Sequence, residues 1–376
     1  MISDRRRVLL VSGIFLTATL ISFIVLNRWL VTDIGLLSYG RIWQLYVSYS
    51  DFGFVRRALI GTILTESGIN SAFANEYHFA LVIHHISIAI LAGLIAYYCI
   101  SRKITNPLFL VSIAFSPALI IHSGYSTGSL DVFVAILAAI NILFVRNLTI
   151  FSIFIVSGIL IHELFIFTVP AQFLAMLIHG SKVQSSYSFK ILVAPIFAFT
   201  AAAIAVTFFG TVDMPRETVE QIMRQKIPIA EGQHGLWSGY VEIARSTEQY
   251  AAGSLNRLSS VIRTDFIWLV IPLTYVAFLM ARLLTYSERM IESVAMSIAV
   301  LAPLLTALVA TDYHRWVAMS ANMGILLTLV YATQTGRTES RWNVPILIFC
   351  LLAPFGGAQI DRPFPMHQFV FERFMN

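Results

Sequence analysis

Charged residues are scarce in this chain of 376 residues, at 12% where soluble proteins have about a quarter. Cysteine is nearly absent too. Because Cys99 and Cys350 both lie in apolar runs, neither a disulfide framework nor a thiolate zinc site is expected. What is abundant is hydrophobic side chains, at 57% of the residues, with a mean hydropathy of +0.78. This composition excludes an ordinary soluble enzyme and indicates an integral membrane protein.

Several motifs of soluble catalysis are also missing. The sequence has no glycine-rich phosphate loop followed by Lys and Ser or Thr, no dinucleotide fingerprint, no Gly-x-Ser-x-Gly elbow and no paired-cysteine metal site. These absences argue against a nucleotide-driven pump and against a serine hydrolase. The net charge of +5 fits basic cytoplasmic loops of a membrane protein, so we expect no nucleic-acid partner.

Apolar runs of membrane-crossing length predict an all-α, polytopic membrane bundle of about eleven transmembrane helices. The stretch 148–179 is too long for one crossing and is interrupted by His162-Glu163, so we expect a tight hairpin of two short spans there. The first run, 8–30, lacks the cleavage site of a signal peptide and is expected to remain as a span. The remaining runs are 78–100, 107–123, 130–146, 190–209, 266–284, 291–310, 316–334 and 343–357.

Lys and Arg gather in the short connections of one side, which predicts a cytoplasmic N-terminus. We expect one transmembrane domain, 1–376, with two large loops on the outer face. The first, 31–77, carries amphipathic helices, and the second, 211–265, has runs that look helical at 217–226 and 242–258. The compact chain and its short inner loops favour a bacterial inner membrane with the outer face toward the periplasm.

Ionisable residues collect at the outer turns, although a charge near lipid costs about 2.5–3.5 kcal/mol at a helix centre, and this asymmetry indicates a functional site. A secondary transporter would instead place such residues near the midplane, where only His84 and His85 lie. The candidates come from the first outer loop and three further turns, and they are Asp33, Asp51, Arg56, Arg57, His122, Asp131, His162, Glu163, Asp312, His314 and Arg315.

Each group has two interpretations. Arg56 and Arg57, with aromatic neighbours, fit an interfacial anchor or a phosphate site, since guanidinium groups bind phosphate oxygens in pairs. His162-Glu163 fits a hairpin tip or an acid/base or metal-binding pair, and without a second histidine four residues beyond the glutamate it is no zinc-protease motif. Asp312 and Arg315, three residues apart, fit a local ion pair or part of the site.

In the second loop, Arg224 and Gly235 are separated by ten residues, with Glu231 and His234 between them. This spacing is similar to the Arg-x10-Gly pattern described for O-antigen polymerases. It also occurs by chance in a chain of this length, and a solvated amphipathic cover is the structural alternative for the whole loop.

The overall arrangement resembles the GT-C class of integral-membrane glycosyltransferases: an inside N-terminus, a first span, a long first outer loop with an acidic residue, many spans and a second large outer loop. The resemblance implies a polyprenyl-phosphate-linked sugar as donor and a site at the outer face. It also implies an acidic residue of the first loop as base or acceptor-positioning group. The matching residue is Asp51, with Asp33 as second choice, although Phe52 stands where many members have a second acidic residue.

We therefore expect a membrane glycosyltransferase, embedded in the lipid bilayer, that transfers a sugar from a polyprenyl-phosphate-linked donor to an envelope glycan or lipid acceptor at the outer face of the membrane. The catalytic candidates are Asp51, Glu163 and Asp33, and no cofactor is required, although Asp51 and Glu163 would suit a divalent metal. The alternatives are a lipid-linked polysaccharide polymerase and a non-catalytic scaffold or lipid exporter. The substrate-binding candidates are Arg56, Arg57, His162, Asp312, His314, Arg315, Arg224 and His234.

Overall fold

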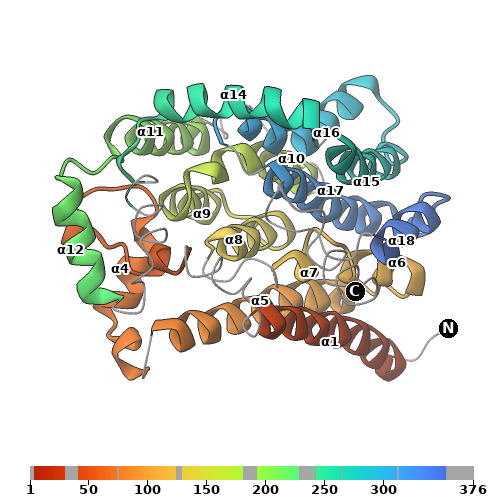
Figure 1. The fold of residues 1–376 in the computed structure, drawn as a ribbon. Helices are drawn as coiled ribbons and strands as arrows, with labels where there is room; N and C mark the ends of the chain where they lie inside the picture. Colours follow the sequence, from red (N-terminus) through yellow and green to blue (C-terminus); the bar gives the residue numbers. More distant parts are fainter. Residues whose placement is uncertain are drawn as a thin grey trace.

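The computed structural model describes residues 4–29, 41–73, 76–123, 129–180, 193–227, 240, 243–264, 266–310 and 313–352 (Figure 1). Within these ranges the regular structure is entirely helical, and no strand is present. The helical class expected from composition and hydropathy is thereby confirmed.

Some of the helices have the length and apolarity needed to cross a membrane. Four segments qualify, and five shorter apolar helices accompany them. The expected number of about eleven transmembrane helices stays a prediction. The four long segments are Asp4–Ile24 in α1 (Asp4–Trp29), His78–Ser101 in α5 (Glu76–Ser101), Met290–Leu308 across α16 (Met290–Leu301) and η5 (Ala302–Leu308), and Arg315–Thr335 in α17 (Tyr313–Thr335). The shorter ones are formed by α8 (Asp131–Leu143), α9 (Leu148–Ile161), η3 (Glu163–Thr168) with α10 (Val169–Gly180), α11 (Val193–Phe209) and α15 (Phe266–Leu284).

The run 107–123, expected as one span, is two helices, α6 (Pro107–Ala114) and α7 (Ile120–Ser123). Pro117 explains the break, because a proline disfavours the helical conformation of the residue before it. The Ser116 hydroxyl compensates for part of the lost helical bonding by accepting hydrogen bonds from the Ala118 N–H at 3.2 Å and the Tyr275 hydroxyl at 2.8 Å.

The chain also breaks between α9 and α10. The side chain of Asn147 caps the start of α9, and the helix ends at Ile161 because His162 is extended. A short 3-10 helix, η3, then leads into α10. The helical break expected at His162-Glu163 is therefore present, but α10 packs on α8 and α16 while α9 packs on α8 and α11, so the two halves do not form a tight hairpin.

Helix α17 lies at the centre of the bundle. It packs against α8, α10, α15 and α16, and 89% of its apolar window is buried within the protein. In Figure 1, α1 and α5 run side by side along one edge, and α14 (Thr247–Thr264) crosses the opposite edge. The main hydrophobic core extends between these layers. The last described helix is α18 (Asn343–Leu352), which contacts α6 and α15.

A second, smaller core joins segments that are far apart in the sequence. It packs the short helices of residues 41–73 against α12 and its neighbours (Figure 1). Two backbone hydrogen bonds reinforce this end of the molecule, from Arg56 N–H to the Gly210 carbonyl at 3.0 Å and from Val212 N–H to the Ile243 carbonyl at 2.9 Å. The short helices are η1 (Trp43–Leu45), α3 (Tyr49–Phe52), α4 (Ala58–Glu66) and η2 (Ile69–Ala72), and α12 is Arg216–Lys226.

Gly61 permits the close approach of α4 to the segment that carries η1. A methyl group at this position would overlap the backbone carbonyl of Val47, which cannot rotate away. We expect Gly61→Ala to destabilise the protein by about 1–3 kcal/mol, measured by thermal unfolding in detergent. Gly93→Ala in α5 is the control, because a methyl group there meets open space and should be neutral or stabilising by up to about 1 kcal/mol. Equal effects of the two substitutions would contradict this packing.

Candidate functional site

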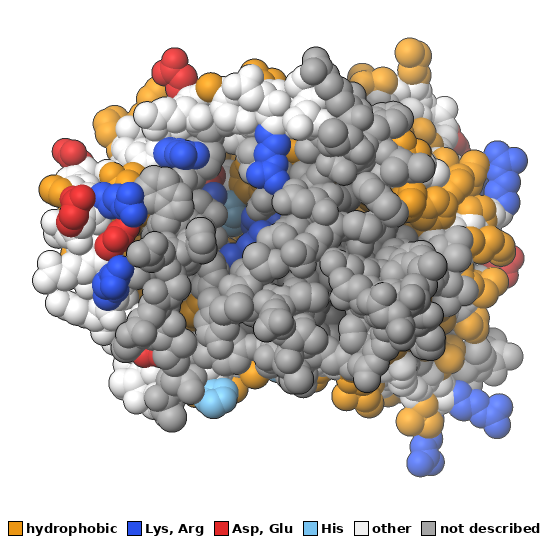
Figure 2. Space-filling view, in the orientation of Figure 1, with side chains coloured by type: hydrophobic (Ala, Val, Ile, Leu, Met, Phe, Trp, Pro, Cys, Tyr) orange, Lys and Arg blue, Asp and Glu red, His pale blue; other side chains and the backbone are white. Residues whose placement is uncertain are grey.

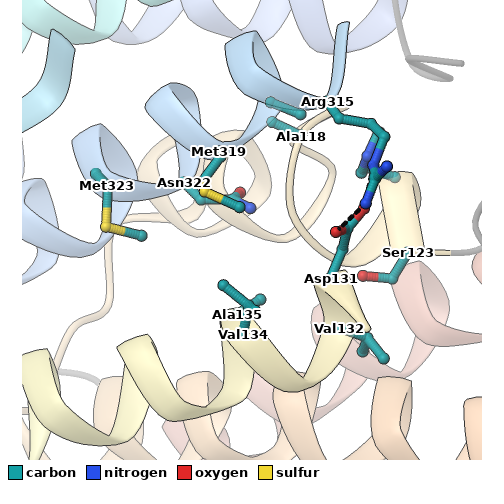
Figure 3. Close-up of a pocket in the computed structure, with 12 residues that line it drawn as sticks. Ala118, Ser123, Asp131, Val132, Val134, Ala135, Arg315, Met319, Asn322 and Met323 are labelled. Carbon is teal, nitrogen blue, oxygen red and sulfur yellow. Dashed lines mark hydrogen bonds and ion pairs between the residues drawn. The ribbon is translucent and has the colours of Figure 1, made fainter. Parts of the chain in front are cut away.

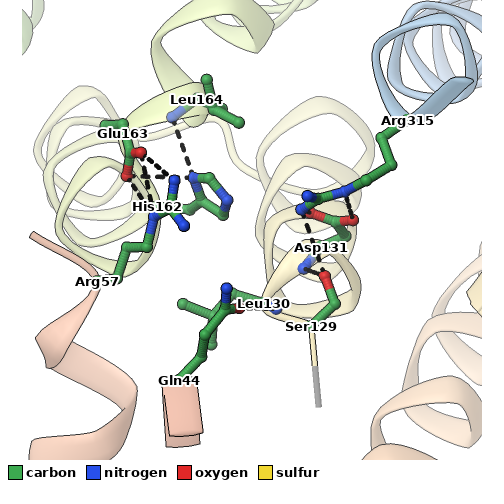
Figure 4. A network of polar contacts seen from close by, with 9 residues as sticks. All are labelled: Gln44, Arg57, Ser129, Leu130, Asp131, His162, Glu163, Leu164 and Arg315. Atoms are coloured by element: carbon green, nitrogen blue, oxygen red, sulfur yellow. Dashed lines mark hydrogen bonds and ion pairs between the residues drawn. The ribbon is translucent and has the colours of Figure 1, made fainter. Parts of the chain in front are cut away.

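Two ion pairs meet at the end of the bundle where α4, α8, α17 and η3 begin. We call the residues around them the polar cluster (Figure 4). Its members come from five separate segments of the chain, and they are Gln44, Arg57, Ser129, Asp131, His162, Glu163 and Arg315.

The first ion pair joins Arg57 to Glu163. Arg57 Nε lies 3.0 Å from both carboxylate oxygens, and one terminal nitrogen also donates to Oε1. The side chains are only 9% and 19% exposed, so the pair is screened from solvent. Arg57 has a φ of 66°, a left-handed conformation that is unfavourable for a side chain other than glycine. This backbone conformation costs free energy locally, and the surrounding structure maintains it with the guanidinium directed at Glu163.

His162 lies beside this pair and has an unusual hydrogen-bonding state. Its Nδ1 lies 3.3 Å from Glu163 Oε2 and accepts the N–H of Leu164, also at 3.3 Å. The other ring nitrogen, Nε2, is buried and finds no hydrogen-bond partner within the described part of the chain. In Figure 4 the ring reaches from Glu163 toward the space in front of Asp131.

The second ion pair joins Arg315, at the start of α17, to Asp131, the first residue of α8. The contact is bidentate, with Nε to Oδ2 at 2.7 Å and a terminal nitrogen to Oδ1 at 2.6 Å. An acidic residue in the first turn also suits the positive end of the α8 dipole. Gln44 accepts the Leu130 N–H at 3.3 Å, so the first loop helps to hold this helix start.

The two pairs form one electrostatic unit. His162 and Arg41 both lie close enough to Asp131 to interact with its charge. The unit thus brings the guanidinium groups of Arg57 and Arg315, each with a carboxylate partner, together with His162 in a poorly solvated region. Figure 2 shows Lys or Arg side chains and a histidine inside a hollow of the surface, in the part of the view where α8 and α9 lie in Figure 1.

Asp51 and Arg56 are directed away from the polar cluster, toward the second loop. Asp51 Oδ2 accepts hydrogen bonds from Ser48 and from Lys226 of α12. The Arg56 guanidinium donates to the backbone carbonyl of Arg245. Both residues therefore tie the first loop to the segments 210–227 and 243–264, and this is a structural task that sequence alone did not assign to them.

The remaining sequence candidates lie apart from the cluster or outside what the structure describes. Arg224 is on the exposed face of α12, where it lines a shallow surface depression with Glu217 and Glu220. Asp33, His234 and Asp312 lie outside the described residues, and so does the side chain of His314. The roles expected for all of these residues stay predictions.

The structure also brings in two residues that sequence reasoning did not select, Gln44 and Lys226, and neither carried a recognisable signal. Asp131 was a candidate on this face, but its pairing with Arg315 was not expected, because Asp312 was considered as the partner. An acidic residue at the first position of an apolar helix, directly after a Ser/Gly-rich turn, is the signal that marks Asp131.

The pKa of the His162 ring is lowered in the folded protein, and this makes the stability of the protein depend on pH. His162 lies between α9 and η3. Burial, aided by the Arg57 guanidinium, lowers the pKa of the ring although Glu163 opposes the shift. Below the ordinary histidine pKa of about 6.5, the unfolded chain therefore binds a proton that the folded protein does not bind. As the pH falls, the free energy of unfolding decreases by at most about 1.4 kcal/mol per pH unit. Above about pH 7 the ring is neutral in both states and contributes no pH dependence.

We expect His162→Gln to remove part of the stability loss between pH 7.5 and pH 5.5, measured as the shift in thermal unfolding midpoint in detergent. His78→Gln, at an exposed position of α5, is the matched control and should leave the acid-induced shift as in the wild type. An unchanged shift in His162→Gln would show that this ring titrates normally.

No cluster of three or more His, Cys, Asp or Glu residues suited to a metal ion occurs in the described ranges. The divalent metal that Asp51 and Glu163 would suit stays a prediction. Comparison with protein-family models, with curated proteins and with solved structures found no match. Function is therefore argued from the polar cluster itself.

Proposed function

We propose that this protein is a membrane glycosyltransferase that uses a polyprenyl-phosphate-linked sugar and delivers it to a glycan or lipid acceptor at the outer face of a bacterial inner membrane. The observation that carries the proposal is the convergence of the Arg57 and Arg315 guanidinium groups with the buried His162 Nε2, which has no partner among the described residues, in the polar cluster. Both features favour an anionic ligand rich in acceptor oxygens. A phosphate that enters from a surrounding bilayer has these properties.

Phosphate binding would use the donors that already converge there. Arg57 and Arg315 are held in place by their carboxylate partners, and such fixed guanidinium groups stabilise developing negative charge without having to reorganise. His162 Nε2 would donate to a phosphate oxygen. The His162 contact would also satisfy a buried ring nitrogen that is costly to leave without a partner.

The transfer itself needs little more than a base. The acceptor hydroxyl oxygen bonds to the anomeric carbon while the bond from that carbon to the phosphate oxygen breaks. The phosphate leaves with the bonding electrons and stays on its lipid, and the hydroxyl proton passes to a carboxylate. Asp131 and Glu163 are the carboxylates of the polar cluster, whereas Asp51 is engaged by Lys226. Because phosphate is a good leaving group, no nucleotide is required.

Binding is the direct test, since it needs no knowledge of the sugar. The purified protein in nanodiscs is exposed to polyprenyl phosphate or to the uncharged polyprenol, and bound lipid is counted by native mass spectrometry. We expect a clear preference for the phosphate, weakened about tenfold or more in Arg315→Gln, as expected for loss of one charged hydrogen-bonding group. Arg216→Gln, which removes an exposed arginine of α12, should bind like the wild type.

A glycosyl-transfer assay is the second test of the proposed function. Proteoliposomes are supplied with a panel of radiolabelled polyprenyl-phosphate sugars and membrane lipid extract, and polyprenyl phosphate release is measured. Equal binding of phosphate and polyprenol, or no release above that of protein-free liposomes, would refute the proposal in favour of a scaffold or exporter. Undiminished release in Arg57→Gln and Arg315→Gln would remove the phosphate-binding role of these two residues. Loss of activity only on replacing Arg224 or His234 would favour the polymerase.

A further inference from the structure

A small cavity lies on the other side of the Asp131–Arg315 pair, between α8 and α17 (Figure 3). Its volume is about 20 Å³. A site needs roughly 10–15 Å³ to accommodate one water molecule, so the space suits a group of that size. Its polar wall is formed by His122, Ser123, Asp131, Asn322 and Arg315, and Met319 and Met323 lie on the apolar wall.

The polar wall of the cavity presents hydrogen-bond acceptors. Asn322 Oδ1 is buried and finds no hydrogen-bond partner among the described residues. In Figure 3 its amide projects from α17 toward the side formed by Asp131 and Arg315. The Ser123 hydroxyl, also in the lining, donates to the Leu119 carbonyl at 3.0 Å, so its oxygen keeps acceptor capacity. A ligand that donates a hydrogen bond would satisfy the Asn322 oxygen, and the Arg315 guanidinium on the same wall is a donor group that suits a hydroxyl oxygen.

The charges around the cavity narrow the choice of ligand. The Asp131 carboxylate disfavours an anion, while the Arg315 guanidinium disfavours a cation. A neutral O–H group satisfies the Asn322 oxygen and fits the volume. We propose that this cavity is a binding site for one hydroxyl group, of water or of an alcohol acceptor, with Asn322 as its hydrogen-bond acceptor.

The assignment of an alcohol rests on the proposed function, whereas occupancy by water does not. In a glycosyl transfer, a hydroxyl held between Asn322 and Asp131 would lie beside the phosphate site on His162 and Arg315. Its oxygen would attack the anomeric carbon, and its proton would pass to the Asp131 carboxylate. This arrangement makes Asp131 the base of the reaction and Asn322 the residue that orients the acceptor.

Water in the cavity can be detected without any activity. X-ray radiolysis in H₂¹⁸O generates hydroxyl radicals from bound water, and these oxidise adjacent methionines to sulfoxide. In phosphatidylcholine nanodiscs, we expect Met323 to be labelled although it is almost fully buried. Met290, which is 85% exposed, is the positive control, and the buried Met296 of α16, which lies outside the cavity lining, is the negative control.

Two variants assign the labelling to the cavity. Asn322→Leu removes the acceptor at similar size, and Ala135→Val narrows the cavity from α8 without touching a polar group. Both should reduce Met323 labelling to the level of Met296 while Met290 is unchanged. A wild-type protein in which Met323 is labelled no more than Met296, or an Asn322→Leu variant labelled like the wild type, would overturn the proposal.

Adding membrane lipid extract and the polyprenyl-phosphate sugars then distinguishes the two sources of the hydroxyl. Protection of Met323 means that an acceptor hydroxyl displaces the water, and unchanged labelling means that water is the resident group. If lipid binding fails while Met323 is labelled, the glycosyltransferase proposal is wrong and the hydroxyl site stands. If phosphate binds but Met323 is unlabelled, only the hydroxyl site is lost.

Discussion

Replacing Arg57 with methionine should destabilise the protein by about 3–5 kcal/mol, because it leaves the Glu163 carboxylate buried without its guanidinium. The free energy of unfolding can be followed by SDS titration in mixed micelles. Arg216→Met is the matched control, since the Arg216–Glu220 pair has side chains that are 45% and 20% exposed. An exposed pair of this kind contributes about 0–1 kcal/mol.

The double variant Arg57→Met/Glu163→Leu separates structure from function. Apolar side chains of similar size often replace a buried ion pair without loss of stability, so most of the destabilisation should disappear. Binding of polyprenyl phosphate should nevertheless stay lost, because the guanidinium is gone. If the single variant Arg57→Met were as stable as Arg216→Met, the pair would not be a buried charge pair in the folded protein.

Asp131→Asn should have the largest effect on transfer, a reduction of about 10²–10⁴-fold in the rate of polyprenyl phosphate release. The amide has the same shape as the carboxylate but cannot accept the hydroxyl proton. Glu220→Gln, which removes a partly buried carboxylate of α12, is the control and should transfer at the wild-type rate. Thermal unfolding of both variants shows whether any loss of rate reflects loss of fold.

The same assay discriminates between Asp131 and Asp51. Asp51 is bonded to Ser48 and Lys226, so we expect Asp51→Asn to weaken the contact between the two loops and to reduce transfer less than Asp131→Asn does. The opposite order, with transfer abolished in Asp51→Asn and retained in Asp131→Asn, would return the base to the first loop, as the sequence alone predicts.

Most helices could be predicted from the sequence because hydropathy is a local property. Apolar runs mark α5, α11, α15 and α17 within a few residues. The run 107–123 was expected to be continuous because its hydropathy is uniform, whereas Pro117 acts on the backbone and leaves hydropathy unaffected.

The residues of the site could be predicted only as a group. Positions at the ends of apolar runs placed Arg57, Glu163, Asp131 and Arg315 at one end of the bundle. Their pairing could not be predicted, because the partners are 106 and 184 residues apart and meet only through helix packing. A spacing of three residues favoured Asp312 for Arg315, and because Asp312 lies outside the described residues that pair stays a prediction. The bidentate contact of Arg315 with Asp131, on another helix, had no local signal.

The enclosure of α17 has a consequence for how the protein is made. Its span has a mean hydropathy of 1.4, the lowest of the four long segments, and it carries Arg315 and Asn322. Lipid alone is a poor environment for such a segment. The helices that surround it, α8, α10, α15 and α16, all precede it in the chain and are synthesised first. Insertion of α17 should therefore depend on this enclosure, and an internal deletion of α15 should impair the insertion of α17 more than that of α5, which precedes α15 in the chain.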